Sequence, residues 1–155
     1  MKKSLRILAV ILTVAVIATV MSACKFTSWS AITYDVSTGD KIKLQLDTTG
    51  GYSQDGKNPF TIKQNDKDIL QGTFIDMDTY NSYVDNVNSG SIEILEQGIK
   101  DSNSFIFYTV DNGTAKEYDF IVMIEGSNTG VLLGGITGQE EVRNCFSNIT
   151  FTVEK

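Results

Sequence analysis

Short runs of alternating apolar and polar residues, separated by turn-forming residues, constrain this chain more than any other feature. Between Lys41 and Leu46 the apolar residues Ile42, Leu44 and Leu46 occupy every second position. Successive side chains of a strand point to opposite faces, so this pattern predicts a half-buried strand. Further strands are expected over Ile32–Val36, Phe60–Gln64, Lys67–Ile75, Ser91–Glu96, Asn103–Val110, Lys116–Glu125, Val131–Ile136 and Thr150–Val153.

The connections between these runs predict an antiparallel sheet. Asn65-Asp66 and Asp111-Asn112-Gly113 are turn sequences of the kind that join hairpin strands, because these residue types tolerate a positive φ. Strands joined by tight hairpins are antiparallel. Val131–Ile136 is continuously apolar and is predicted to lie in the centre of the sheet. The segment from Thr48 to Pro59 is rich in breakers and is predicted to be a loop.

Two segments have helical periodicity instead. In the first, apolar residues recur at steps of three, four and three, at Met77, Tyr80, Val84 and Val87. Asp76 is placed to cap this helix, and Gly90 can end it.

The second predicted helix lies near the C-terminus. Thr137-Gly138-Gln139-Glu140 matches a capping box at its start. Its expected core-facing residues are Val142, Cys145, Phe146 and Ile149.

These elements together predict an α+β fold with a mostly antiparallel sheet and two amphipathic helices. The order resembles the Mog1/PsbP-like fold, an α/β/α sandwich. The resemblance is carried by the helix Met77–Asn88 and by the ending EEVRNCFSNITFTVEK. It implies scaffolding or binding roles and no common active site, and fold alone does not determine function.

The N-terminus has the layout of a secretory signal peptide. Lys2, Lys3 and Arg6 are followed by an uncharged run from Ile7 to Met21. This run is short for a membrane-spanning helix, which needs about 20 apolar residues.

The end of that run resembles the lipobox of bacterial lipoproteins. The tetrad Met21-Ser22-Ala23-Cys24 reads aliphatic, small, small, cysteine, with methionine where leucine is usual. The resemblance implies that Cys24 is lipidated and becomes the first mature residue, on the extracytoplasmic face of the cell membrane. We therefore expect a signal peptide over 1–23, a lipidated N-terminus and tether over 24–39, and one globular domain over 40–155. A plain anchor helix with an incidental cysteine is the alternative.

The net charge of the mature chain limits the kinds of molecule that it is expected to bind. Removal of the signal peptide leaves ten basic and nineteen acidic residues, a net charge of −9. Nucleic acid needs Lys and Arg for its phosphates, so it is not expected to bind. Electrostatic attachment to anionic lipids is disfavoured for the same reason, and the lipid on Cys24 is the expected contact with the membrane.

The chain contains no histidine, which narrows the possible chemistry. Ser-His-Asp and Cys-His catalysis and the usual zinc sites are thereby removed. Cys145 has no histidine to activate it and is expected to be a buried hydrophobic residue.

Two constellations suggest ligands but have simpler explanations. Asp76, Asp78 and Asp85 offer oxygens to calcium, yet a calcium loop needs more ligands at fixed spacing, and helix capping is the preferred interpretation. The glycine-rich GVLLGGITGQEE can cradle an anion, but Glu140 and Glu141 would repel phosphate. We expect no metal and no cofactor.

The resemblance to bacterial lipoproteins implies a bacterial, Gram-positive cell envelope, and together with the single small domain and the missing histidine it favours a non-catalytic binding or accessory domain, with another envelope protein or a glycan as its partner. A binding face can be built from seven aromatic residues, Trp29, Tyr34, Tyr52, Tyr80, Tyr83, Tyr108 and Tyr118. The alternative is a carboxylate-based glycan hydrolase, which would need two carboxylates in one cleft. The sequence singles out no such pair.

Overall fold

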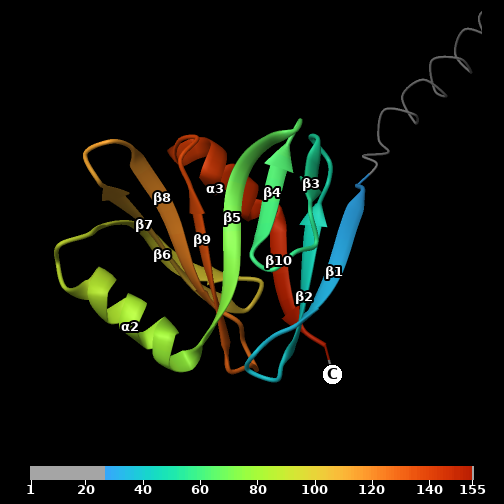
Figure 1. Ribbon diagram of the computed structural model, residues 1–155, viewed down its shortest axis with the longest axis horizontal. Coiled ribbons are helices and arrows are strands. Elements are labelled where there is room, and N and C mark those ends of the chain that lie inside the picture. Colours follow the sequence, from blue (N-terminus) through green and yellow to red (C-terminus); the bar gives the residue numbers. More distant parts are fainter. Residues whose placement is uncertain (1–26, 155) are drawn as a thin grey trace, which may run out of the picture.

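The computed structural model describes residues 27–154 (Figure 1). Within this range the chain folds into ten strands and two helices, and every strand pairing is antiparallel. The predicted α+β class with a mostly antiparallel sheet is therefore confirmed. The strands form two separate sheets of three and seven strands.

The smaller sheet joins the first strands of the domain to the last one. Its members are β1 (Trp29–Asp35), β2 (Lys41–Asp47) and β10 (Ile149–Val153), in the order β1-β2-β10. The alternation in β2 has the predicted consequence, since Ile42, Leu44 and Leu46 are fully buried. β1 begins three residues earlier than expected. The part of the expected tether from Trp29 to Asp35 therefore belongs to the sheet.

The larger sheet has the order β3-β4-β5-β9-β8-β7-β6. Its strands are β3 (Tyr52–Gln54), β4 (Phe60–Gln64), β5 (Lys67–Asp76), β6 (Glu93–Lys100), β7 (Asn103–Asp111), β8 (Lys116–Met123) and β9 (Thr129–Gly135). The predicted central strand, now β9, is the middle one. The residues of β3 were expected to belong to a loop, and this expectation is wrong. The strand is only three residues long and follows two glycines, so the sequence shows no alternating pattern there.

Hairpin turns set the register of this sheet. Asn65 and Asp66 have φ values of 49° and 66°. Two successive positive φ values are typical of the tight turn whose twist matches that of the flanking strands. The hairpin predicted at this position, between β4 and β5, is confirmed.

The main core lies between the inner faces of the two sheets. Phe60 and Phe74 of the larger sheet pack against Phe151 of β10, with ring centroids 6.4 and 6.3 Å from it. The helix α3 (Gln139–Ser147) covers the rest of this inner face, where Phe146 stacks on Phe120 at 4.0 Å.

Two details at α3 differ from expectation, although Val142, Cys145 and Phe146 are buried as predicted. The N-cap is Gly138 with a φ of 136°, and no side chain caps the helix, so the predicted capping box is wrong. Ile149 is buried but opens β10 instead of ending the helix.

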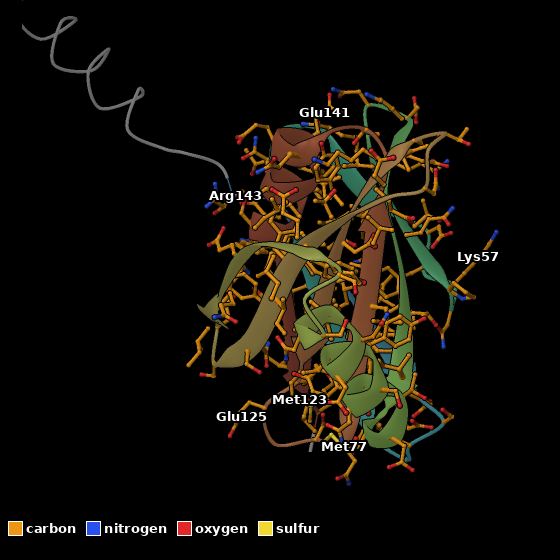
Figure 2. All side chains as sticks on the ribbon, turned by 90° about the vertical axis from the view of Figure 1, so that its left-hand side faces the viewer. Lys57, Met77, Met123, Glu125, Glu141 and Arg143 are labelled. Atoms are coloured by element: carbon orange, nitrogen blue, oxygen red, sulfur yellow. The ribbon has the colours of Figure 1, made fainter. Side chains whose placement is uncertain are left out.

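The helix α2 (Met77–Asn88) lies on the outer face of the larger sheet. Its buried residue Val87 packs with Tyr108 and Ile121 in a second, smaller core. The predicted cap is confirmed, since the Asp76 carboxylate accepts a hydrogen bond of 2.8 Å from the Thr79 amide. α2 covers the end of the sheet near Met77 and Met123, whereas α3 lies at the opposite end (Figure 2).

The larger sheet thus carries one helix on each face, but a second sheet shares the inner face with α3. The likeness to the Mog1/PsbP-like sandwich stays a prediction.

Candidate functional site

The outer face of the larger sheet is only partly covered by α2, and the uncovered part carries polar residues. The registers of β5, β9, β8 and β7 bring Gln71, Gly134, Asp119 and Tyr108 into one row across the sheet. Glu117 lies on the same face as Asp119, two residues away on β8. Strand pairing therefore places two carboxylates, an amide and a tyrosine side by side.

Gly134 determines how closely these carboxylates approach the sheet. A Cβ atom built on Gly134 would lie 2.7 Å from Asp119 Oδ1 and 3.1 Å from Glu117 Oε1. The two oxygens are therefore at most 5.8 Å apart, the sum of these distances. Both carboxylates occupy space above the glycine that a side chain on β9 would otherwise fill.

The environment of Asp119 favours its neutral form. Burial, followed by the negative charge of Glu117, raises the pKa of Asp119 to about 7, whereas hydrogen bonding to the Tyr108 hydroxyl acts in the opposite direction. Asp119 Oδ1 is buried and has no hydrogen-bond partner among the described residues. An unpaired buried polar atom is costly, so a group that donates a hydrogen bond to this carboxylate would be bound favourably.

These residues line a surface cavity of about 410 Å³. We call it the carboxylate groove, and define it by Gln71, Thr73, Tyr83, Tyr108, Glu117, Asp119 and Gly134. Tyr83 comes from α2, so the helix forms one wall and the sheet forms the floor. Pockets that bind small ligands have volumes of about 300–1,000 Å³.

A second cavity of about 370 Å³ continues the carboxylate groove toward α3. The two share Gln71, Glu117 and Gly134, and the second reaches Ile136, whose side chain is 69% exposed. Together they provide a path longer than one small molecule along the outer face.

The seven aromatic residues predicted to form one binding face do not gather in one place. Only Tyr83 and Tyr108 line the carboxylate groove. Tyr34 and Tyr52 are buried in the main core, and Tyr118 packs against it. Trp29 lies at the start of β1 and is 54% exposed.

The other predicted ligand features have structural roles. Asp76 caps α2, and no group of three or more metal-binding side chains converges within residues 27–154. Gly134 and Gly135 of the glycine-rich segment belong to β9, and only Gly138 lies at a helix start. Cys24 and its lipobox lie outside the described residues. Within the described range no helix has the length and apolar character needed to cross a membrane.

Asp119, Glu117 and Gly134 were not singled out by the sequence analysis. A signal was present, because Asp119 directly precedes the apolar run that ends β8, Phe120-Ile121-Val122-Met123, in a strand where a charged residue faces a cost of burial. Its meaning depended on Gly134, which is 15 positions away and becomes a neighbour only through strand pairing.

No protein-family model matches this chain, and no curated protein matches it in sequence with significance. The proposed function therefore depends on the N-terminal motif and on the carboxylate groove.

Proposed function

We propose that this protein is a lipid-anchored, extracytoplasmic binding or accessory domain of a bacterial, Gram-positive cell envelope, and that the carboxylate groove is its ligand site. The anchor is supported by the basic N-terminus, the uncharged run and the tetrad ending in Cys24. The other cysteine, Cys145, is a buried free cysteine, so it does not form a disulfide that would use Cys24.

The observation that carries the binding role is the Asp119 carboxylate. It is held against the sheet with Oδ1 unpaired, inside a cavity that also presents Glu117 and two tyrosines. Native proteins rarely leave a buried polar atom without a partner unless something else uses it. A ligand that donates hydrogen bonds supplies that partner.

A glycan is the ligand class that the lining fits best. The ionised carboxylates accept hydrogen bonds, whereas the tyrosine hydroxyls, the amide of Gln71 and the hydroxyl of Thr73 both donate and accept them. Sugar hydroxyls need this mixture of donors and acceptors. The rings of Tyr83 and Tyr108 add apolar area at low cost in side-chain entropy.

The arrangement favours binding over hydrolysis. Glycosidases place two carboxylates on either side of the bond that is cleaved. Asp119 and Glu117 project from one strand onto the same glycine, so they lie side by side on the floor of the carboxylate groove.

Mass spectrometry of the protein extracted from membranes tests the anchor. The expected mature chain begins at Cys24 and carries a diacylglyceryl thioether. An intact signal peptide or an unmodified Cys24 would contradict the proposal.

Isotope-edited NMR of the full-length protein tests the ligand site. Titration with N-acetylglucosamine oligomers is expected to shift the resonances of Asp119, Gly134 and Tyr83. Asp119→Asn should abolish these shifts, and Glu125→Gln, a change at an exposed acid near the α2 end of the molecule (Figure 2), should preserve them. Glucosamine, which carries a positive charge, is the companion probe. Resonance shifts with glucosamine but not with the oligomers would contradict the glycan and indicate that the carboxylate groove binds a cationic ligand.

Glycan hydrolysis remains the second candidate, because one specific observation favours it. The two carboxylate oxygens lie within 5.8 Å of each other, and the pKa of Asp119 is about 7, as a general acid requires. New reducing ends released from cell-wall glycan by the native protein, but not by Glu117→Gln or Asp119→Asn, would establish this activity.

A further inference from the structure

The folded domain begins very close to the predicted lipidation site. The main-chain oxygen of Ser28 accepts hydrogen bonds from the amide and the hydroxyl of Thr48, at 2.8 and 2.9 Å. The Ser28 amide donates to Thr49 Oγ1 at 3.5 Å. Ser28 is therefore tied to the loop after β2, and only residues 25–27 separate it from Cys24.

This short connection limits how far the domain can stand from the membrane. Each residue of a fully extended chain spans at most about 3.6 Å, so Ser28 lies within ~14 Å of Cys24, whatever the conformation between them. The headgroup layer of a bilayer is about 5–8 Å thick on each side. A lipid on Cys24 therefore brings the Ser28 end of the domain to the membrane surface. The tether expected over 24–39 is therefore shortened, because residues Trp29–Asp35 form β1.

The surface at this end has the character of a lipid contact. Trp29 is 54% exposed and pairs across β1 and β2 with Asp47. The loop that follows, Thr48-Thr49-Gly50-Gly51, contains no charged residue. The Asp47 carboxylate already accepts a hydrogen bond of 2.8 Å from the Thr49 amide.

The adjoining turn between β4 and β5 lies at the same end, since the Asn65 amide donates to the Gly51 carbonyl at 3.0 Å. Its acidic residue, Asp66, is flanked in sequence by Lys63 and Lys67. Lys63 pairs with Asp68 at 3.0 Å and Lys67 pairs with Glu141 at 3.1 Å, so these lysines give this end no net positive charge, and the proposed contact depends on the uncharged loop and on Trp29.

We propose that this end is a membrane-contact surface and that Trp29 inserts into the lipid headgroup layer. The proposal depends on the lipidation of Cys24 in the proposed function. Tryptophan is enriched at membrane interfaces because its ring is apolar and its N–H is polar. The C-terminus leaves from the opposite end of the small sheet, where β10 pairs Val153 with Ile42 (Figure 1), so the proposed orientation directs it away from the membrane.

Fluorescence tests the proposal directly, because Trp29 is the sole tryptophan of the chain. The full-length lipidated protein is reconstituted into vesicles of phosphatidylcholine and phosphatidylglycerol, with and without brominated acyl chains. The expected result is a blue-shifted emission that is quenched by bromine near the headgroups. An unshifted, unquenched emission would overturn the proposal.

A matched variant moves the tryptophan along the same face of β1. Thr33 is exposed and lies four residues further on, about 13 Å from Trp29 along the strand. In the double variant Trp29→Phe, Thr33→Trp the quenching is expected to be lost. Equal quenching at positions 29 and 33 would show that the sheet lies flat on the membrane and would contradict contact through this end.

Mass spectrometry of the same samples separates the two proposals. A lipidated Cys24 with an unquenched Trp29 leaves the anchor standing and refutes the membrane-contact surface. A chain without lipid refutes the anchor itself.

Discussion

Gly134 of β9 and Asp119 of β8 are direct cross-strand partners, and the glycine provides the space in which the aspartate carboxylate is buried. No other residue type at position 134 leaves this space empty. The raised pKa of Asp119 is thus a consequence of a pairing between two strands, and it can be changed from either partner.

Replacing the glycine moves the carboxylate. In Gly134→Ala the new methyl group would lie 2.7 Å from Asp119 Oδ1, which is too close, and a flexible side chain can turn away toward water. We expect the pKa of Asp119 to fall from about 7 toward the ordinary value of 3.8, because its burial is lost. Carbon-13 NMR titration of the side-chain carboxyl measures this change. Gly98→Ala on the edge strand β6, where the added atom meets Phe105 at 3.4 Å, is the control that should leave the pKa of Asp119 unchanged.

A substitution at the neighbouring Gly135 is expected to change the stability of the fold and not the pKa of Asp119. A Cβ atom on Gly135 would point to the inner face, against the main-chain oxygen of Ile69 and 2.8 Å from Val142 Cγ2. Neither the backbone of β5 nor the packed helix α3 can yield easily. We expect Gly135→Ala to lower the free energy of unfolding by about 3 kcal/mol, as overpacked core positions do. Urea denaturation of both alanine variants checks this, and equal stabilities would refute the assignment of the two glycines to opposite faces.

The raised pKa of Asp119 should also make the free energy of unfolding depend on pH. Its pKa is about 7 in the folded state and about 3.8 in the unfolded chain, so the folded state binds the proton more tightly. Well below pH 3.8 the Asp119 carboxyl is neutral in both the folded and the unfolded state, so its ionisation does not lower the stability. As the pH rises from about 4 to 7 the unfolded chain ionises first, and stability falls until the folded state ionises as well.

Asp119→Asn removes this dependence. We expect the variant to become the more stable protein above pH 7, by about 2 kcal/mol after discounting for the partial exposure of the carboxylate to water. Thermal denaturation from pH 4 to 8 measures the difference. A difference between wild type and variant that stays constant with pH would mean that Asp119 has an ordinary pKa.

The sequence contained enough information for the elements but not for the carboxylate groove. The alternation of Ile42, Leu44 and Leu46 and the turn at Asn65 are local signals, and each produced the expected structure. The division into two sheets is not local, because β10 returns from the C-terminus to pair with β2. Asp119 acquires its properties from Gly134 by the same kind of distant pairing.

Predictions from local sequence were wrong at two positions where tertiary contacts determine the backbone conformation. The sequence around Thr137 matches a capping box, yet the chain enters α3 through Gly138 in a positive-φ conformation. Ile149 continues the apolar stripe of the helix, but β2 offers it a strand partner in Leu46. In both cases the tertiary structure, through a backbone turn before α3 and through strand pairing after it, outweighs the local preference.

Asn103 connects β7 to β10 and to the turn between β8 and β9, and it should be important for stability. Its buried side chain donates from Nδ2 to the Phe151 carbonyl at 2.9 Å and accepts at Oδ1 from the Glu125 amide at 2.9 Å. Asn103→Ala leaves both backbone groups without these partners, which costs about 2–3 kcal/mol. Urea denaturation measures the loss. Ser104→Ala, at an exposed neighbouring position on β7, should change stability by less than about 0.5 kcal/mol.

Cys145 should behave as an unreactive core residue. It lies on α3 with a fully buried side chain, and burial raises the pKa of its thiol to about 12. Because the thiolate is the reactive species, almost none is present at neutral pH, and the described residues include no histidine that could activate it. We expect a thiol reagent such as iodoacetamide to modify Cys145 of the native, lipidated protein only as fast as the domain unfolds. Adding urea should accelerate the modification in proportion to the unfolded fraction. Rapid labelling in the absence of urea would show that α3 opens locally, and that its packing on Phe120 is weaker than the stacked rings imply.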